Sequence, residues 1–85
     1  MARKEYNGHE SWNAWNVALW IDNDEGLYSL AMECIERPRK DGRPVTAALA
    51  ALRFSQVIPN NEKTPDGAKY SFRSVKLAMA GLMEG

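Results

Sequence analysis

Hydrophobic and polar positions follow a helical period along most of the chain. Residues 11–21 place three tryptophans within nine positions, and apolar side chains surround the helix axis except for a narrow polar seam at Asn13 and Asn16. Such a helix needs cover on nearly every side, by other elements or by a partner chain. Ser11 is the expected N-cap, and the helix should run to about Asp22. We therefore predict that this tryptophan helix is the centre of the fold.

Three more helices are predicted downstream. Residues 24–37 are amphipathic, and their apolar face holds Leu27, Tyr28, Leu30, Ala31, Cys34 and Ile35. Residues 45–57 are rich in alanine and carry two apolar stripes, so we expect them to pack between two neighbours, one of them the tryptophan helix. Residues 71–83 present one apolar stripe, and no segment shows convincing strand alternation. The prediction is a single all-α domain, a compact bundle of about four helices.

Turn-forming residues separate these helices. Residues 1–10 are an expected lead-in, although Asn7 with Glu10 would allow an earlier start of the first helix. Asp22 or Asn23 is the expected cap of the second helix. Residues 38–43 form a loop that Pro38 begins and Asp41-Gly42 turns, and Pro44 suits the first turn of the third helix.

The longest irregular segment is 59–70, which carries two prolines and is the strongest candidate for mobility. Asn13, Asn16 and Trp20 fall on one side of the first helix. Buried amides need hydrogen-bond partners, so we expect them to bind the backbone of the lead-in or of 59–67. The alternative is a small exposed aromatic and amide patch that binds a partner.

Composition narrows the possible functions. The 85 residues have 45% hydrophobic and 26% charged side chains and a net charge of zero, which argues against strong attraction to nucleic acid or an anionic membrane. No apolar run approaches the roughly 20 residues that span a bilayer. The polar N-terminus lacks the core of a signal peptide, so we expect a cytoplasmic protein.

Motifs for catalysis are missing from the sequence. His9 is the single histidine and cannot begin a His-Glu-x-x-His motif, because Asn13 occupies the second histidine position. Cys34 is the single cysteine, and its place among apolar residues is typical of a small buried hydrophobe. The glycines form no phosphate-binding loop and no nucleophile elbow. We expect no enzyme activity, no cofactor and no metal.

Two blocks of opposite charge meet at the end of the second predicted helix. The first holds five carboxylates and no basic residue: Asp22, Asp24, Glu25, Glu33 and Glu36. The second holds four cations opposed by Asp41: Arg37, Arg39, Lys40 and Arg43. These blocks are either solvated surface or partner-binding surface. The acidic face would suit a basic protein surface, and the basic loop would give only modest, salt-sensitive affinity for phosphates.

A family resemblance adds context. The turn Tyr6-Asn7-Gly8 and the run from Trp15 to Tyr28 (Trp-Asn-Val-Ala-Leu-Trp-Ile-Asp-Asn-Asp-Glu-Gly-Leu-Tyr) resemble a family of small proteins of bacteriophages and prophages, in which position 12 is a tyrosine rather than Trp12. The resemblance implies a phage accessory gene and carries over no active site. Small proteins from such loci are often inhibitors of host defence, and anti-CRISPR proteins are among them.

The leading hypothesis is therefore a non-enzymatic inhibitor in the host cytoplasm that binds a host protein, such as a CRISPR–Cas effector subunit. One alternative is a small nucleic-acid-binding regulator that uses the 37–43 loop. Another is a structural homodimer joined through the tryptophan helix, whereas the leading hypothesis is compatible with a monomer or a homodimer.

Overall fold

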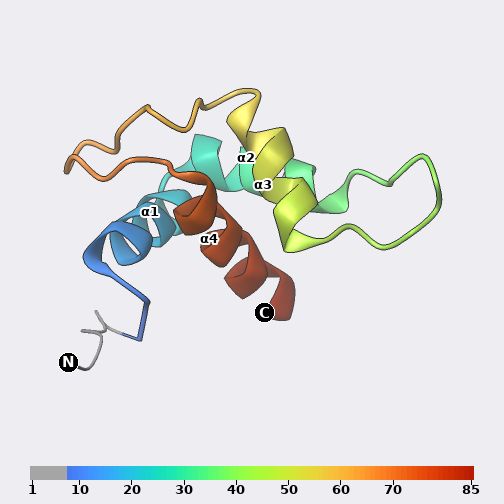
Figure 1. Ribbon diagram of the computed structural model, residues 1–85, viewed down its shortest axis with the longest axis horizontal. Helices are drawn as coiled ribbons and strands as arrows, with labels where there is room; N and C mark the ends of the chain where they lie inside the picture. Colours follow the sequence, from blue (N-terminus) through green and yellow to red (C-terminus); the bar gives the residue numbers. More distant parts are fainter. Residues whose placement is uncertain (1–7) are drawn as a thin grey trace.

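The computed structural model describes residues 8–85 and contains four helices (Figure 1). They are α1 (Trp12–Asn23), α2 (Glu25–Glu36), α3 (Ala47–Ser55) and α4 (Phe72–Glu84). This part of the chain forms no β-strand, and its loops hold an isolated bridge between Lys63 and Lys69. The prediction of an all-α bundle of about four helices is confirmed. Most of the predicted lead-in, with Tyr6, Asn7 and the alternative cap at Asn7, lies outside the described residues.

A side-chain cap starts each helix. The side-chain oxygens of Ser11, Asp24, Thr46 and Ser71 each accept a hydrogen bond from the backbone N–H three residues later. Ser11 confirms the predicted start of α1. Asp22 and Asn23 were wrong as caps of α2, because α1 continues through Asn23 and Asp24 serves both helix ends.

The third helix begins later than the sequence suggested. Pro44 was predicted to lie in its first turn, but the chain stays irregular up to Thr46, whose hydroxyl accepts from the Leu49 N–H at 3.1 Å. The first backbone N–H groups of a helix lack partners within it, so the helix begins where a side chain such as Thr46 can accept from one of them. The fixed φ of Pro44 supplies no such acceptor. The Asp41-Gly42 turn is confirmed, with Gly42 at a φ of +76° that favours glycine.

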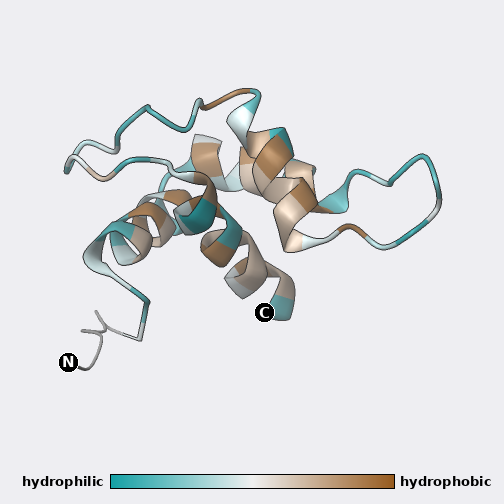
Figure 2. Cartoon of the chain, in the orientation of Figure 1, coloured by the Kyte–Doolittle hydropathy of each residue, from teal (hydrophilic) through white to brown (hydrophobic). Residues whose placement is uncertain are grey.

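The helix at the centre of the packing is α4. It lies between α1 and α3 and packs against both, while α2 packs against the same two helices from another side (Figure 1). The expectation that the third helix contacts the tryptophan helix is wrong, because α4 occupies the space between them. The apolar positions of all four helices contrast with the hydrophilic loops in Figure 2.

Tryptophans are not the core of this fold. The largest fully buried side chains are Phe54, Ile21, Met79, Val17, Val75 and Asn16. Trp12 is 41% exposed, and Trp15 and Trp20 are half-buried. The other elements of the chain therefore do not cover α1 all round, and the alternative of cover by a partner chain stays a prediction. Its buried residues are Ala14, Asn16, Val17, Ala18 and Ile21, and the two alanines allow the neighbouring helices to approach this side closely.

Segment 59–70 is fastened to α1 by a group of polar side chains, here called the loop clamp (Asn13, Asn16, Trp20, Thr64 and Asp66). The Asn13 amide pairs with the backbone of Lys69, accepting from its N–H at 3.0 Å and donating to its carbonyl at 2.9 Å. The Thr64 hydroxyl donates to Asn16 Oδ1 at 2.6 Å, and Asn16 Nδ2 and Trp20 Nε1 each donate to Asp66 Oδ2 at 2.9 Å. The expectation that these amides bind the backbone of 59–67 is confirmed only in part: Asn16 binds this segment through the side chains of Thr64 and Asp66, and Asn13 binds backbone at Lys69, beyond residue 67. The alternative of an exposed amide patch is wrong for Asn16, which is buried.

The loop clamp makes stability depend on pH. Hydrogen bonds from Asn16 and Trp20 hold the pKa of the Asp66 carboxyl below its ordinary value of 3.8. A depressed folded-state pKa stabilises the fold above the unfolded-state pKa, and that stabilisation is lost as the pH falls through the folded-state pKa. We therefore expect Asp66→Asn to lower the melting temperature at neutral pH and to flatten its decline between about pH 5 and pH 2.

Thermal unfolding followed by circular dichroism across this pH range measures the effect. Glu62→Gln is the matched control, since Glu62 lies in the same segment and its side chain has no hydrogen bond or ion pair among the residues described. Melting curves of Asp66→Asn and wild type that stay parallel from neutral to acid pH would contradict the assignment.

Candidate protein-binding surface

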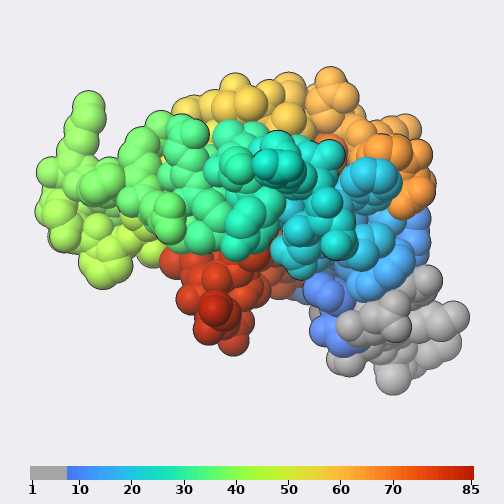
Figure 3. Space-filling model, turned by 180° about the vertical axis from the view of Figure 1, so that it is seen from behind, coloured from blue at the N-terminus to red at the C-terminus, as the bar shows by residue number. Residues whose placement is uncertain are grey.

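The outer face of α2 is an exposed surface that carries both apolar and charged side chains. Its inner face buries Ala31 and Cys34 against α1 and α3. The opposite face lies open to solvent along the helix (Figure 3) and forms an open groove of about 530 Å³. We call this feature the α2 groove; its lining residues are Tyr28, Ser29, Met32, Glu33, Glu36 and Arg37.

Apolar side chains occupy the first half of the α2 groove. Tyr28 is 42% exposed, and the half-buried Met32 follows it one helical turn later. The sequence placed Tyr28 on the core face beside Leu27, which is wrong. Neighbouring helical residues differ by about 100° around the axis, and the interior reaches Leu27 but leaves Tyr28 at its border.

Four of the five predicted acidic site residues are free to meet a partner. Asp22, Glu25, Glu33 and Glu36 are exposed, and none makes an ion pair or a side-chain hydrogen bond within residues 8–85. Asp24 differs, because its carboxylate accepts from the Leu27 N–H at 3.0 Å and caps α2. The free carboxylates thus run from the α1–α2 junction to the end of the α2 groove.

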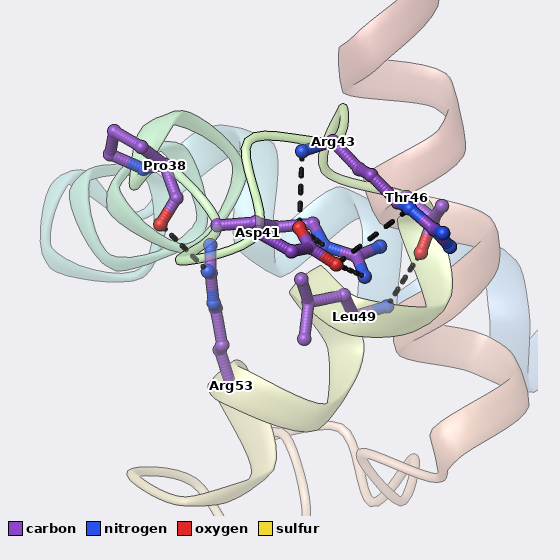
Figure 4. A network of polar contacts seen from close by, with 7 residues as sticks. Pro38, Asp41, Arg43, Thr46, Leu49 and Arg53 are labelled. Atoms are coloured by element: carbon purple, nitrogen blue, oxygen red, sulfur yellow. Dashed lines mark hydrogen bonds and ion pairs between the residues drawn. The ribbon is translucent and has the colours of Figure 1, made fainter.

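The basic loop partly neutralises itself. It extends away from the helices (Figure 1), and its Arg39 donates to both carboxylate oxygens of Asp41, at 2.9 and 2.6 Å. These bonds lower the pKa of Asp41, and the backbone N–H of Arg43 donates to the same carboxylate at 3.1 Å (Figure 4). Of the four cations that the sequence sets against Asp41, Arg39 is therefore the one that the carboxylate binds most closely. Arg37 and Lys40 are exposed, and the largely exposed Arg43 side chain lies 3.9 Å from the Asp41 carboxylate.

Arg53 of α3 was not singled out from the sequence, yet it closes the C-terminal end of α2. Its guanidinium donates to the carbonyl oxygens of Cys34 at 2.9 Å and Arg37 at 2.6 Å. A third bond, to the carbonyl of Pro38 at 3.4 Å, is drawn in Figure 4. A cation at this end satisfies unpaired carbonyls and complements the helix dipole. Arg53 thereby fixes Arg37 at the end of the α2 groove, where the acidic face and the basic loop meet.

Groups suited to catalysis do not converge in the described region. Cys34 is buried, and that burial raises the pKa of its thiol, which confirms the interpretation as a small hydrophobe. His9 is half-buried before α1 and does not line the α2 groove. Residues 8–85 contain no group of three His, Cys, Asp or Glu side chains that could hold a metal ion. None of the four helices is long and apolar enough to cross a bilayer.

These features define a small all-α domain with an open, charged groove rather than an enclosed pocket. The chain belongs to the family of unknown function DUF7249, which matches residues 2–85. No curated protein and no solved structure matches it significantly.

Proposed function

We propose that this protein is a non-enzymatic, phage-type inhibitor of a bacterial defence system that acts by binding a host protein. The proposed contact is the α2 groove. The target class we favour is a subunit of a CRISPR–Cas effector, an anti-CRISPR-like role.

The observation that carries the proposal is the pairing of the exposed Tyr28 and the half-buried Met32 with free carboxylates on α2. Tyr28 and Met32 offer aromatic and thioether surface, and Glu33 and Glu36 border it without ion-pair partners. Aromatic and methionine side chains are enriched in protein interfaces, which also carry a polar rim. Free carboxylates on such a rim favour encounter with a basic surface and select against acidic ones.

The phage resemblance supports the proposed context. The resembling run extends from α1 into the first turn of α2 and ends at Tyr28, which lies in the α2 groove. The run therefore includes one proposed contact residue as well as core residues of α1.

The nucleic-acid alternative has weaker support. Asp41 binds Arg39 and lies against Arg43, so part of the positive charge of the loop is offset within the loop. The nearby carboxylates of α2 would also repel phosphates.

A pull-down tests the proposed function. Tagged protein is incubated with lysate of a bacterium that carries a CRISPR–Cas system, and bound proteins are identified by mass spectrometry. We expect recovery of a defence-complex subunit whose purified activity falls when the protein is added. Recovery of no stable partner, or of nucleic acid alone with binding that weakens steeply in salt, would contradict the proposal.

A further inference from the structure

We infer that the α2 groove accepts a basic amphipathic helix of its protein partner, with apolar side chains over Tyr28 and Met32 and lysine or arginine beside Glu33 and Glu36. This inference rests on the proposed function and names the kind of element that is bound. It follows from the shape of the α2 groove, its charge and the backbone it presents.

The α2 groove offers the rows of side chains on which one helix can pack against another. Its lining residues form two adjacent rows with four-residue spacing, Tyr28–Met32–Glu36 and Ser29–Glu33–Arg37. Ridges of this spacing on one helix pack into the grooves between such rows on another, usually at a crossing angle of about −50°. The 12 residues of α2 span about 18 Å, which is long enough for a partner helix to cross. Small Ser29 beside Tyr28 leaves room for an apolar side chain between the rows.

Charge selects which helix fits. Glu25, Glu33 and Glu36 lie free on this helix, and Arg37 is the single cation that lines the α2 groove. A partner helix with cations flanking its apolar ridge would pair with these carboxylates and exclude water from Met32. The same carboxylates would repel an acidic helix, so charge provides specificity as well as attraction.

Other occupants fit less well. A second copy of this chain would bring two sets of the same carboxylates together, with one Arg37 from each copy to oppose them. An extended peptide that adds to a sheet edge needs free backbone donors and acceptors. A helix surface offers none between its ends, because its backbone groups bond to one another.

A peptide titration tests the inference without knowledge of the natural target. The probe is a synthetic amphipathic helical peptide of leucine and lysine, and the comparison peptide has glutamate in place of every lysine. Binding to the full chain is followed by backbone amide NMR shifts and by calorimetry. We expect the lysine peptide to shift the amides that surround Met32 and Glu33 and the glutamate peptide to shift none.

Charge-reversal variants assign the contact. Glu33→Lys with Glu36→Lys should weaken binding of the lysine peptide about tenfold or more, since both expected ion pairs become repulsive. Glu62→Lys with Glu84→Lys makes the same change of net charge elsewhere on exposed positions and should leave affinity within about twofold. Melting temperatures verify that both double variants are folded. We expect the α2 double variant to fold, because cations near the C-terminal end of a helix interact favourably with its dipole.

Three results would overturn the inference: no binding, equal loss of affinity in both double variants, or self-association through α2 seen by sedimentation. None of these requires the proposed function to fail, because the pull-down could still recover a defence subunit that binds another surface. Conversely, the lysine peptide could bind at α2 while the pull-down recovers no defence subunit. That result would support the preference of the α2 groove for a basic helix and contradict the proposed function.

Discussion

Replacing Phe54 by alanine is expected to destabilise the fold by about 3–5 kcal/mol. Phe54 is 0% exposed, and its ring lies 5.9 Å from that of Tyr70 with the planes tilted by 42°. Truncation would remove this aromatic contact and leave a cavity between α3 and the segment that enters α4. A domain of this size has about 5–15 kcal/mol of stability, so the variant should be partly or wholly unfolded at 37 °C.

Urea denaturation followed by circular dichroism measures the loss. Phe72→Ala is the matched control, because the same atoms are removed from a side chain that is 37% exposed at the first turn of α4. We expect that control to cost about 1 kcal/mol. Equal losses for the two variants would show that Phe54 does not occupy the core.

Replacing Asn16 by alanine should cost about 2–3 kcal/mol, a large effect for one polar side chain. Asn16 is 1% exposed, accepts from the Thr64 hydroxyl and donates to Asp66. Its loss leaves a buried hydroxyl without its acceptor and releases segment 59–70 from α1. The Ala68 amide donates to Thr64 Oγ1, so its hydrogen exchange should speed up more than exchange in α4 does.

The control for this prediction is Asn23→Ala. The Asn23 amide bonds to the Leu19 carbonyl at the exposed end of α1, and its loss should change the free energy of unfolding by no more than about 0.5 kcal/mol. Unchanged exchange at Ala68 in Asn16→Ala would contradict the role assigned to the loop clamp.

Hydrophobic periodicity was sufficient to predict the four helices, because each has an apolar stripe and turn formers at its ends. It did not predict which helix lies at the centre. The tryptophan content of α1 suggested a core, but packing depends on which faces can approach closely. The small alanines of α1 and of α3 each allow α4 to approach closely. The Val75 and Met79 side chains of α4 lie between these two helices.

The loop clamp was partly predictable, because two amides on an otherwise apolar helix require partners. The sequence identified segment 59–67 as one candidate for them, together with the lead-in. It did not identify Thr64 and Asp66, since their positions depend on how the segment folds back over α1.

The charged residues of the candidate site could be predicted from the sequence, but their contacts and their arrangement on the surface could not. All five acidic residues could be named from the sequence, but which one caps α2 depends on where α1 ends. The Arg39–Asp41 pair depends on the tight turn at Gly42. Tyr28 and Met32 join the site because α1 and α3 cover only one side of α2.

The most direct test of the central claim is the plating efficiency of a phage on bacteria whose CRISPR–Cas system targets it. The cells express wild-type protein, the Glu33→Lys and Glu36→Lys double variant, or the Glu62→Lys and Glu84→Lys double variant at matched levels. We expect the wild type and the second double variant to restore plaque formation, and the α2 double variant to fail although it is folded. Equal restoration by all three proteins would contradict the role of α2, and restoration by none would contradict the inhibitor function itself.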